Sequence, residues 1–196
     1  MFTARLVFAL MLAATIAPPA VADEILDQIN NGIQLYKSGD FAGAASELEF
    51  AAAQIRQLRA GEVSGALPKP LAGWTAPDAE TSAMGTAFFG GGTSASRKYT
   101  KGDASVEVQI VTDSPMLQGV TMLLNNPTLL GASGQKLIRV KGNKAALEWE
   151  TDHGTIQVVV AGSVLVSVTG YECKQDDLTA YAEAVDYELL KQIMSR

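Results

Sequence analysis

Residues 136–171, KLIRVKGNKAALEWETDHGTIQVVVAGSVLVSVTGY, decide the fold. Apolar residues recur there at every second position. The members of this pattern are Ile138 and Val140, then Ala145, Leu147 and Trp149, then Ile156, Val158 and Val160, and finally Val164, Val166 and Val168. Because side chains of a strand point alternately to its two faces, this spacing predicts antiparallel strands with one apolar face. Val106, Val108 and Ile110 predict a further strand of the same kind.

The turns between these strands fix the register, since a slip of one residue would turn a strand's apolar side to water. We expect turns at 101–104, 142–143, 151–154 and 161–163, each of which contains a glycine. Glycine accepts the positive φ angles that tight turns need. The cross-strand pairs that follow are Tyr99 with Val106, Lys98 with Glu107, Val140 with Ala145, Trp149 with Ile156, and Val160 with Val164.

Apolar residues recur at helical spacing over residues 24–37 and 41–59, with a break at Ser38-Gly39-Asp40. This pattern predicts an α-helical hairpin. Its turn and second helix contain Gly39, Asp40, Phe41, Ala44, Leu48, Glu49 and Ala51. This set resembles the middle of a tetratricopeptide repeat, in which small residues let two helices pack closely. A free-standing array needs at least about three repeats, so a single copy implies docking on the rest of the chain or on a partner.

Two more amphipathic helices are predicted to cover the apolar face of the sheet. The first follows Ser114-Pro115 and ends before Pro127, with Met116, Leu117, Val120, Leu123 and Leu124 along one side. The second begins at Asp176-Asp177 and continues unbroken, with Leu178, Tyr181, Ala182, Val185, Leu189 and Ile193 on one face. The predicted fold class is therefore α+β: an antiparallel sheet of about five to six strands with helices on its apolar face, preceded by a helical hairpin.

Four segments are expected along the chain. They are a signal peptide at 1–22, the helical hairpin at 23–60, a Gly/Pro-rich linker or strap at 61–93, and the sheet domain at 94–196. The order of elements in the sheet domain is similar to that of the PsbP-like class of secreted and lumenal proteins. That resemblance implies binding or assembly more often than catalysis.

The amino terminus has the features of a secretory signal peptide. Arg5 is followed by an apolar stretch over residues 6–17 and by Ala20-Val21-Ala22, an A-x-A cleavage site. The stretch is shorter than the about 20 residues that span a bilayer, so no stable membrane insertion is expected after cleavage. We expect a soluble periplasmic protein whose mature chain begins near Asp23.

Composition excludes several function classes. The 196 residues include 15 Lys plus Arg and 21 Asp plus Glu, a formal charge of −6 that disfavours binding to nucleic acid. One Cys and one His exclude a disulfide within the chain and most metal sites, so no metal is expected. No cofactor is expected either, because the dinucleotide-like string Gly90-x-Gly92-x-x-Ala95 precedes a strand where the fingerprint needs a helix. Cys173 is expected to be a small buried residue.

Catalytic motifs are weak. His153 follows Asp152, but no G-x-S-x-G nucleophile motif is present, and the histidine is predicted to lie in a solvated turn. The leading expectation is a secreted non-catalytic binding or assembly protein whose partner is another periplasmic protein. One alternative is a small periplasmic hydrolase that uses His153. The other is a carrier of lipid or another small ligand, with the ligand between the sheet and its helices.

Two surfaces are candidates for partner binding. Phe88 and Phe89 stand before three glycines, where two aromatic side chains serve either as a core plug or as a partner anchor. The outer face of the sheet is expected to carry Val111, Leu137, Val159 and Leu165 among polar residues. These four form either an exposed patch or a surface covered by the helical hairpin.

Overall fold

The computed structural model describes residues 20–83 and 92–195. The chain divides into a helical unit that ends at Ala51 and a sheet unit that begins at Ala52. Among the described helices, none is both long enough and apolar enough to cross a membrane.

The helical unit contains α1 (Ala20–Ser38) and the first part of α2 (Phe41–Ser64). Gly39, with φ +86°, ends α1 in the left-handed conformation that glycine adopts without a steric cost. The Asp40 carboxylate accepts a hydrogen bond from the backbone N–H of Gly43 at 2.9 Å and so caps the start of α2. The predicted helical hairpin is confirmed.

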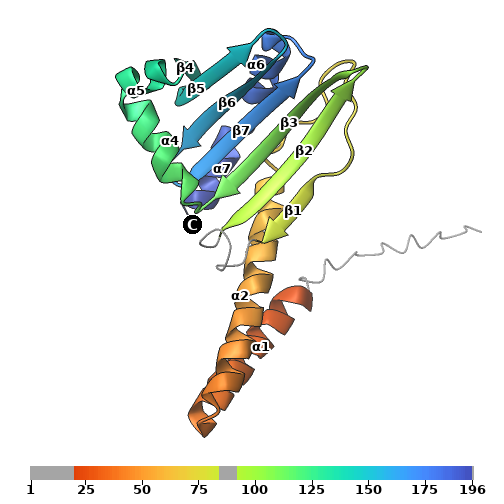
Figure 1. Ribbon diagram of the computed structural model, residues 1–196. Coiled ribbons are helices and arrows are strands. Elements are labelled where there is room, and N and C mark those ends of the chain that lie inside the picture. The colour runs from red at the N-terminus through yellow and green to blue at the C-terminus, as the bar shows by residue number, and fades with distance from the viewer. Residues whose placement is uncertain (1–19, 84–91, 196) are drawn as a thin grey trace, which may run out of the picture. The chain divides into compact units, whose positions relative to one another are not determined.

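The sheet unit contains one antiparallel sheet in the order β1-β2-β3-β7-β6-β5-β4 (Figure 1). The described strands are β1 Glu80–Ala83, β2 Thr93–Lys101, β3 Ala104–Thr112, β4 Lys136–Val140, β5 Asn143–Glu150, β6 His153–Val160 and β7 Val164–Tyr171. The antiparallel α+β prediction is confirmed, but the described sheet has seven strands where five to six were expected. The sequence did not indicate β1, because its four residues, ETSA, lack an alternating apolar pattern.

The predicted register is confirmed in two hairpins, namely for Tyr99 with Val106, Lys98 with Glu107, and Val160 with Val164. In the other two it is wrong by two residues, since Val140 pairs with Asn143 and Trp149 with Gly154. The first of these turns is the dipeptide Lys141-Gly142, with φ +47° and +83°, whose twist matches that of the flanking strands. A shift of two residues leaves every side chain on its predicted face, so the apolar face is preserved.

The apolar face of the sheet packs against α6 (Gln175–Ala184), α7 (Tyr187–Met194) and the end of α2. The prediction of one unbroken C-terminal helix is wrong. The chain extends at Val185, and the Asp186 carboxylate caps α7 by accepting a hydrogen bond from the Leu189 N–H at 2.9 Å. In the new helix phase Leu190 is fully buried in the core, and Leu189 is partly buried and packs against it.

The opposite face of the sheet carries α4 (Met116–Asn125) and α5 (Pro127–Ala132), as Figure 1 shows. The buried side chains of this second cluster are Leu117, Val120, Leu124, Leu130, Ala146 and Leu165. The prediction that α4 covers the main apolar face is therefore wrong, because helical spacing does not say which face of a sheet the helix meets. Asn126 ends α4 and also caps α5 by accepting a hydrogen bond from the Leu129 N–H.

The described chain between α2 and β1 lies on the main core. Leu67 and Trp74 are buried there, and the Trp74 ring meets the Tyr181 ring edge-on with centroids 5.2 Å apart. The Tyr99 hydroxyl donates a hydrogen bond of 2.6 Å to the carbonyl oxygen of Pro68. These contacts fill the space between the sheet and its helices with protein side chains.

Candidate functional site

Large apolar side chains are exposed on the helical unit. Leu26, Ile33 and Tyr36 of α1 and Phe41 and Leu48 of α2 keep 41% to 65% of their surface accessible to water. We call these five residues the hairpin face. The apolar residues that are buried in the same unit include Ile25, Ala44 and Ala51.

The spacing of these residues explains why they share one side of each helix. In α2 the stripe runs Phe41, Ala44, Leu48 and Ala51, and in α1 it runs Leu26, Ile29, Ile33 and Tyr36. Steps of three and four residues produce one continuous apolar stripe along a helix. In α2 the small members of the stripe are buried, while the large ones are exposed.

Two contacts join the two stripes into one surface. The Tyr36 ring meets the Phe41 ring edge-on, with centroids 5.5 Å apart. Leu48 lies over Gly32, where an added Cβ would come within 2.9 Å of the Leu48 Cγ atom. The absence of a side chain at Gly32 therefore lets Leu48 cross onto α1, and the exposed residues of both helices form one face.

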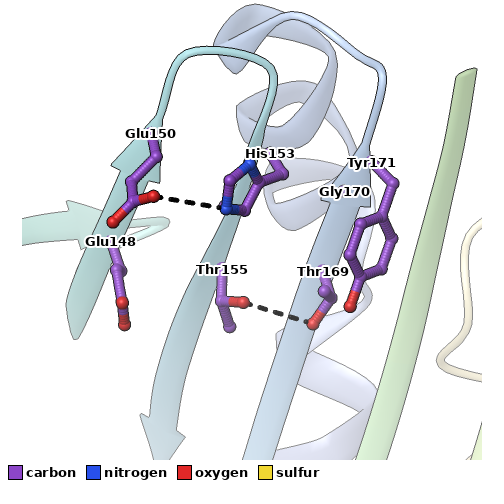
Figure 2. Close-up of a pocket in the computed structure, with 8 residues that line it drawn as sticks. Glu148, Glu150, His153, Thr155, Thr169, Gly170 and Tyr171 are labelled. Carbon is purple, nitrogen blue, oxygen red and sulfur yellow. Dashed lines mark hydrogen bonds and ion pairs between the residues drawn. The ribbon is translucent and has the colours of Figure 1, made fainter.

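A polar hollow lies on the sheet unit, on the face opposite the main core (Figure 2). Its volume is about 140 Å³. Neighbouring strands contribute the polar side chains, which Figure 2 shows pointing to the same side: Glu148 and Glu150 from β5, His153 and Thr155 from β6, and Thr169 and Tyr171 from β7.

His153 contacts two carboxylates at this hollow. Its Nε2 atom lies 3.5 Å from a Glu150 oxygen, its Nδ1 atom lies 3.2 Å from an Asp152 oxygen, and its side chain is 49% exposed. The residues that line the hollow include neither Ser nor Cys, and the hydroxyls of Thr155 and Thr169 lie 3.4 Å from each other. A general base needs a nucleophile within hydrogen-bond reach, whereas the His153 contacts within the described residues are with the carboxylates of Glu150 and Asp152.

The predicted partner-binding residues have different outcomes. Phe88 and Phe89 lie outside the described residues, so their role stays a prediction. On the outer face of the sheet, Leu165 is buried and Val159 is half-buried in the cluster beneath α4. Both alternatives were left open by the sequence, and at these two positions α4 supplies the cover. Leu137 is exposed and Val111 is half-buried.

Sequence reasoning did not identify the hairpin face. Helical spacing predicts an apolar stripe, but the spacing is the same whether the stripe is buried or exposed. The available signal was the alternation of small and large residues in α2, where Ala44 and Ala51 alternate with Phe41 and Leu48. Small residues suit a close helix contact, whereas Phe41 and Leu48 keep 65% and 42% of their surface exposed.

Comparison of the chain with family models, with curated proteins and with solved structures finds no significant match. The functional interpretation therefore depends on the geometry of the chain itself. Within residues 20–83 and 92–195, no three His, Cys, Asp or Glu side chains are grouped in a way that could hold a metal ion.

Proposed function

We propose that the chain is a secreted, periplasmic and non-catalytic binding or assembly protein, and that its hairpin face binds another protein. The observation that carries this proposal is the hairpin face itself, on which five large apolar side chains are exposed on one small unit. Contiguous apolar patches on soluble proteins usually mark interaction sites. Tyr36 and Phe41, whose rings are in contact, have the character of aromatic anchors.

The free energy of hydration favours the same conclusion. Fully burying a Leu, Ile or Phe side chain contributes about 1.5–3 kcal/mol, and a half-exposed side chain has roughly half of this still to gain. The seam of the hairpin contains Gly32, Ala44 and Ala51, which bury little apolar surface. A further helix laid across the hairpin face would supply the apolar layer that a two-helix unit lacks.

The periplasmic location is part of the proposal. It depends on the charged start at Arg5, the apolar stretch over residues 6–17 and the small residues at 20–22. The resemblance to a tetratricopeptide-type hairpin and the PsbP-like order of elements are consistent with a binding or assembly role.

The two alternatives receive less support from the geometry. For a hydrolase, the hollow around His153 offers paired threonine hydroxyls and an exposed imidazole. For a carrier, the space between the sheet and its helices would have to hold a ligand, but Tyr99, Tyr181 and Trp74 pack there. We therefore place neither activity ahead of protein binding.

The experiment compares two matched variants in the cells that make the protein. Phe41→Ser removes an anchor of the hairpin face. Phe50→Ser makes the same chemical change in the same helix, at a residue that is 54% exposed and lies about 200° around the helix axis from Leu48. Serine and phenylalanine have similar helix propensities, so neither variant should weaken α2 by itself.

Size-exclusion chromatography of periplasmic extracts supplies the readout. The processed chain is smaller than the 20.6 kDa of the full sequence. We expect the wild type and Phe50→Ser to elute in a complex larger than the processed chain, and Phe41→Ser to elute as the free chain. All three proteins should melt at the same temperature after purification. Elution of the wild type as a free monomer, with or without mild cross-linking, would contradict the proposed function.

A further inference from the structure

We infer that the occupant of the hairpin face is a basic amphipathic helix of the partner protein. This inference rests on the proposed function and adds the chemistry of the partner to it. Three features of the helical unit carry the argument: the length of the hairpin face, its charged flanks, and the absence there of ion pairs with any residue that the structure describes.

The length of the hairpin face suits one helix. Leu26 and Tyr36 are ten residues apart in α1, so the face extends over about 15 Å at a rise of 1.5 Å per residue. A partner helix of about three turns, with apolar residues at i, i+3, i+4 and i+7, matches this length. Such a helix would present one apolar side to the five residues and two polar sides to the flanks.

The charges on the helical unit indicate which charged residues the polar sides of the partner helix should carry. Residues 24–51 contain the acidic residues Glu24, Asp27, Asp40, Glu47 and Glu49, and Lys37 as the one basic residue. Asp27 follows Leu26, and Glu49 follows Leu48. Because each residue of a helix is turned by about 100° from the one before it, both carboxylates lie on the outer flanks of the hairpin face. Neither residue takes part in an ion pair within the described part of the chain.

The charges also decide between a foreign helix and a second copy of this chain. The apolar contribution is similar for both, because either would cover the same five side chains. A second copy would bring carboxylates to carboxylates, whereas lysine or arginine on a foreign helix would pair with them. A few exposed ion pairs change an affinity by about tenfold, which is enough to decide between occupants with equal apolar contacts.

Two synthetic peptides of 14 residues test the inference on the exported chain. Both place leucine at i, i+3, i+4 and i+7. One carries lysine at the other positions, and its counterpart carries glutamate. Fluorescence anisotropy of labelled peptide should show the lysine peptide binding the wild type and Phe50→Ser equally, and Phe41→Ser at least tenfold more weakly. The glutamate peptide should bind the wild type at least tenfold more weakly than the lysine peptide does. Added salt should weaken the binding of the lysine peptide.

The other outcomes overturn the inference and separate it from the proposed function. Equal binding of the two peptides would mean that the partner is not selected by charge. Loss of binding in Phe50→Ser as strong as in Phe41→Ser would mean that binding of the lysine peptide is not specific to the hairpin face. A wild-type dimer in sedimentation, lost in Phe41→Ser, would show that a second copy covers the face. In the first two cases, the size of the native complex still tests the proposed function on its own. In the third case, the dimer contradicts both the inference and the proposal that the face binds another protein.

Discussion

At the scale of single residues, Cys173 shows how packing controls reactivity. It is a buried free thiol, as expected from the sequence, and its sulfur lies so close to Gly170 that an added Cβ there would collide with it. Burial raises the pKa of the Cys173 thiol, and the neighbouring carboxylates of Asp177 and Asp152 raise it further. A raised pKa leaves less thiolate, which is the nucleophilic form.

We therefore predict that Cys173 is unreactive in the folded protein. At pH 8, a chromogenic disulfide reagent should titrate no thiol in the native chain and one thiol after unfolding in guanidinium. Cys173→Ala should give no signal in either condition. Native labelling as fast as labelling of the unfolded chain would show that the thiol is accessible.

Because three tyrosines are buried, we predict that the folded protein loses stability at alkaline pH. Burial raises the pKa of Tyr99 from 10.0 to about 12, and burial also raises the pKa values of Tyr181 and Tyr187. The unfolded chain therefore loses these protons at a lower pH than the folded chain does. The stability that they contribute is fully present below about pH 10 and is lost as the pH rises towards 12.

Thermal melting between pH 8 and 11.5 tests this effect. The melting temperature of the wild type should fall above pH 10, and that of Tyr99→Phe should fall less steeply. At pH 8 the variant should be less stable by about 1 kcal/mol, because it lacks the hydrogen bond to Pro68. Parallel pH profiles for the two proteins would mean that Tyr99 does not contribute to the alkaline transition.

At the scale of elements, the alternation along β6 gives two neighbouring positions opposite environments. Val158 is fully buried under the helices, whereas Gln157 is half-buried on the other face. We predict that Val158→Asp unfolds the sheet unit, because an unpaired buried charge costs several kcal/mol against a typical total stability of about 5–15 kcal/mol. Gln157→Asp should keep a cooperative melt close to that of the wild type. Circular dichroism melting gives the comparison, and equal damage from both changes would mean that β6 is buried on two sides.

The same elements show what the sequence could and could not predict. The alternation of Val164, Val166 and Val168 predicted a strand and its buried face, because the period of two is a direct consequence of strand geometry. The placement of α4 could not be predicted, because an apolar stripe does not identify the surface that it meets. The break at Val185 could not be predicted either, because the apolar spacing continues through it. A side-chain cap by Asp186 starts the new helix there.

At the scale of the whole molecule, the unpredicted parts depend on distant contacts. The strand β1 forms because Glu80–Ala83 meets β2 in space, and nothing in those four residues specifies the pairing. The hairpin face is apparent only when α1 and α2 are placed together, because Leu48 lies over Gly32, which is sixteen residues earlier in the sequence. The class of fold was predictable from the sequence, whereas the exposed hairpin face was not.

The proposed export of the chain to the periplasm gives a prediction for the whole molecule. If residues 1–22 are a cleaved signal peptide, the intact mass of the exported protein should place its amino terminus at Asp23, within one or two residues. The mass of protein from a periplasmic extract supplies the measurement. Recovery of chains that begin at Met1 in the membrane fraction would contradict export by this route.

Photo-crosslinking in living cells tests the binding role of the hairpin face most directly. A benzoylphenylalanine placed at Phe41 keeps an aromatic side chain in the hairpin face, and one placed at Phe50 reports on another side of the same helix. We predict that illumination joins the chain to one discrete protein through position 41, at least tenfold more efficiently than through position 50, since contacts at a specific interface are confined to one patch. Equal crosslinking from the two positions, or none from position 41, would contradict the proposal that this face binds a partner.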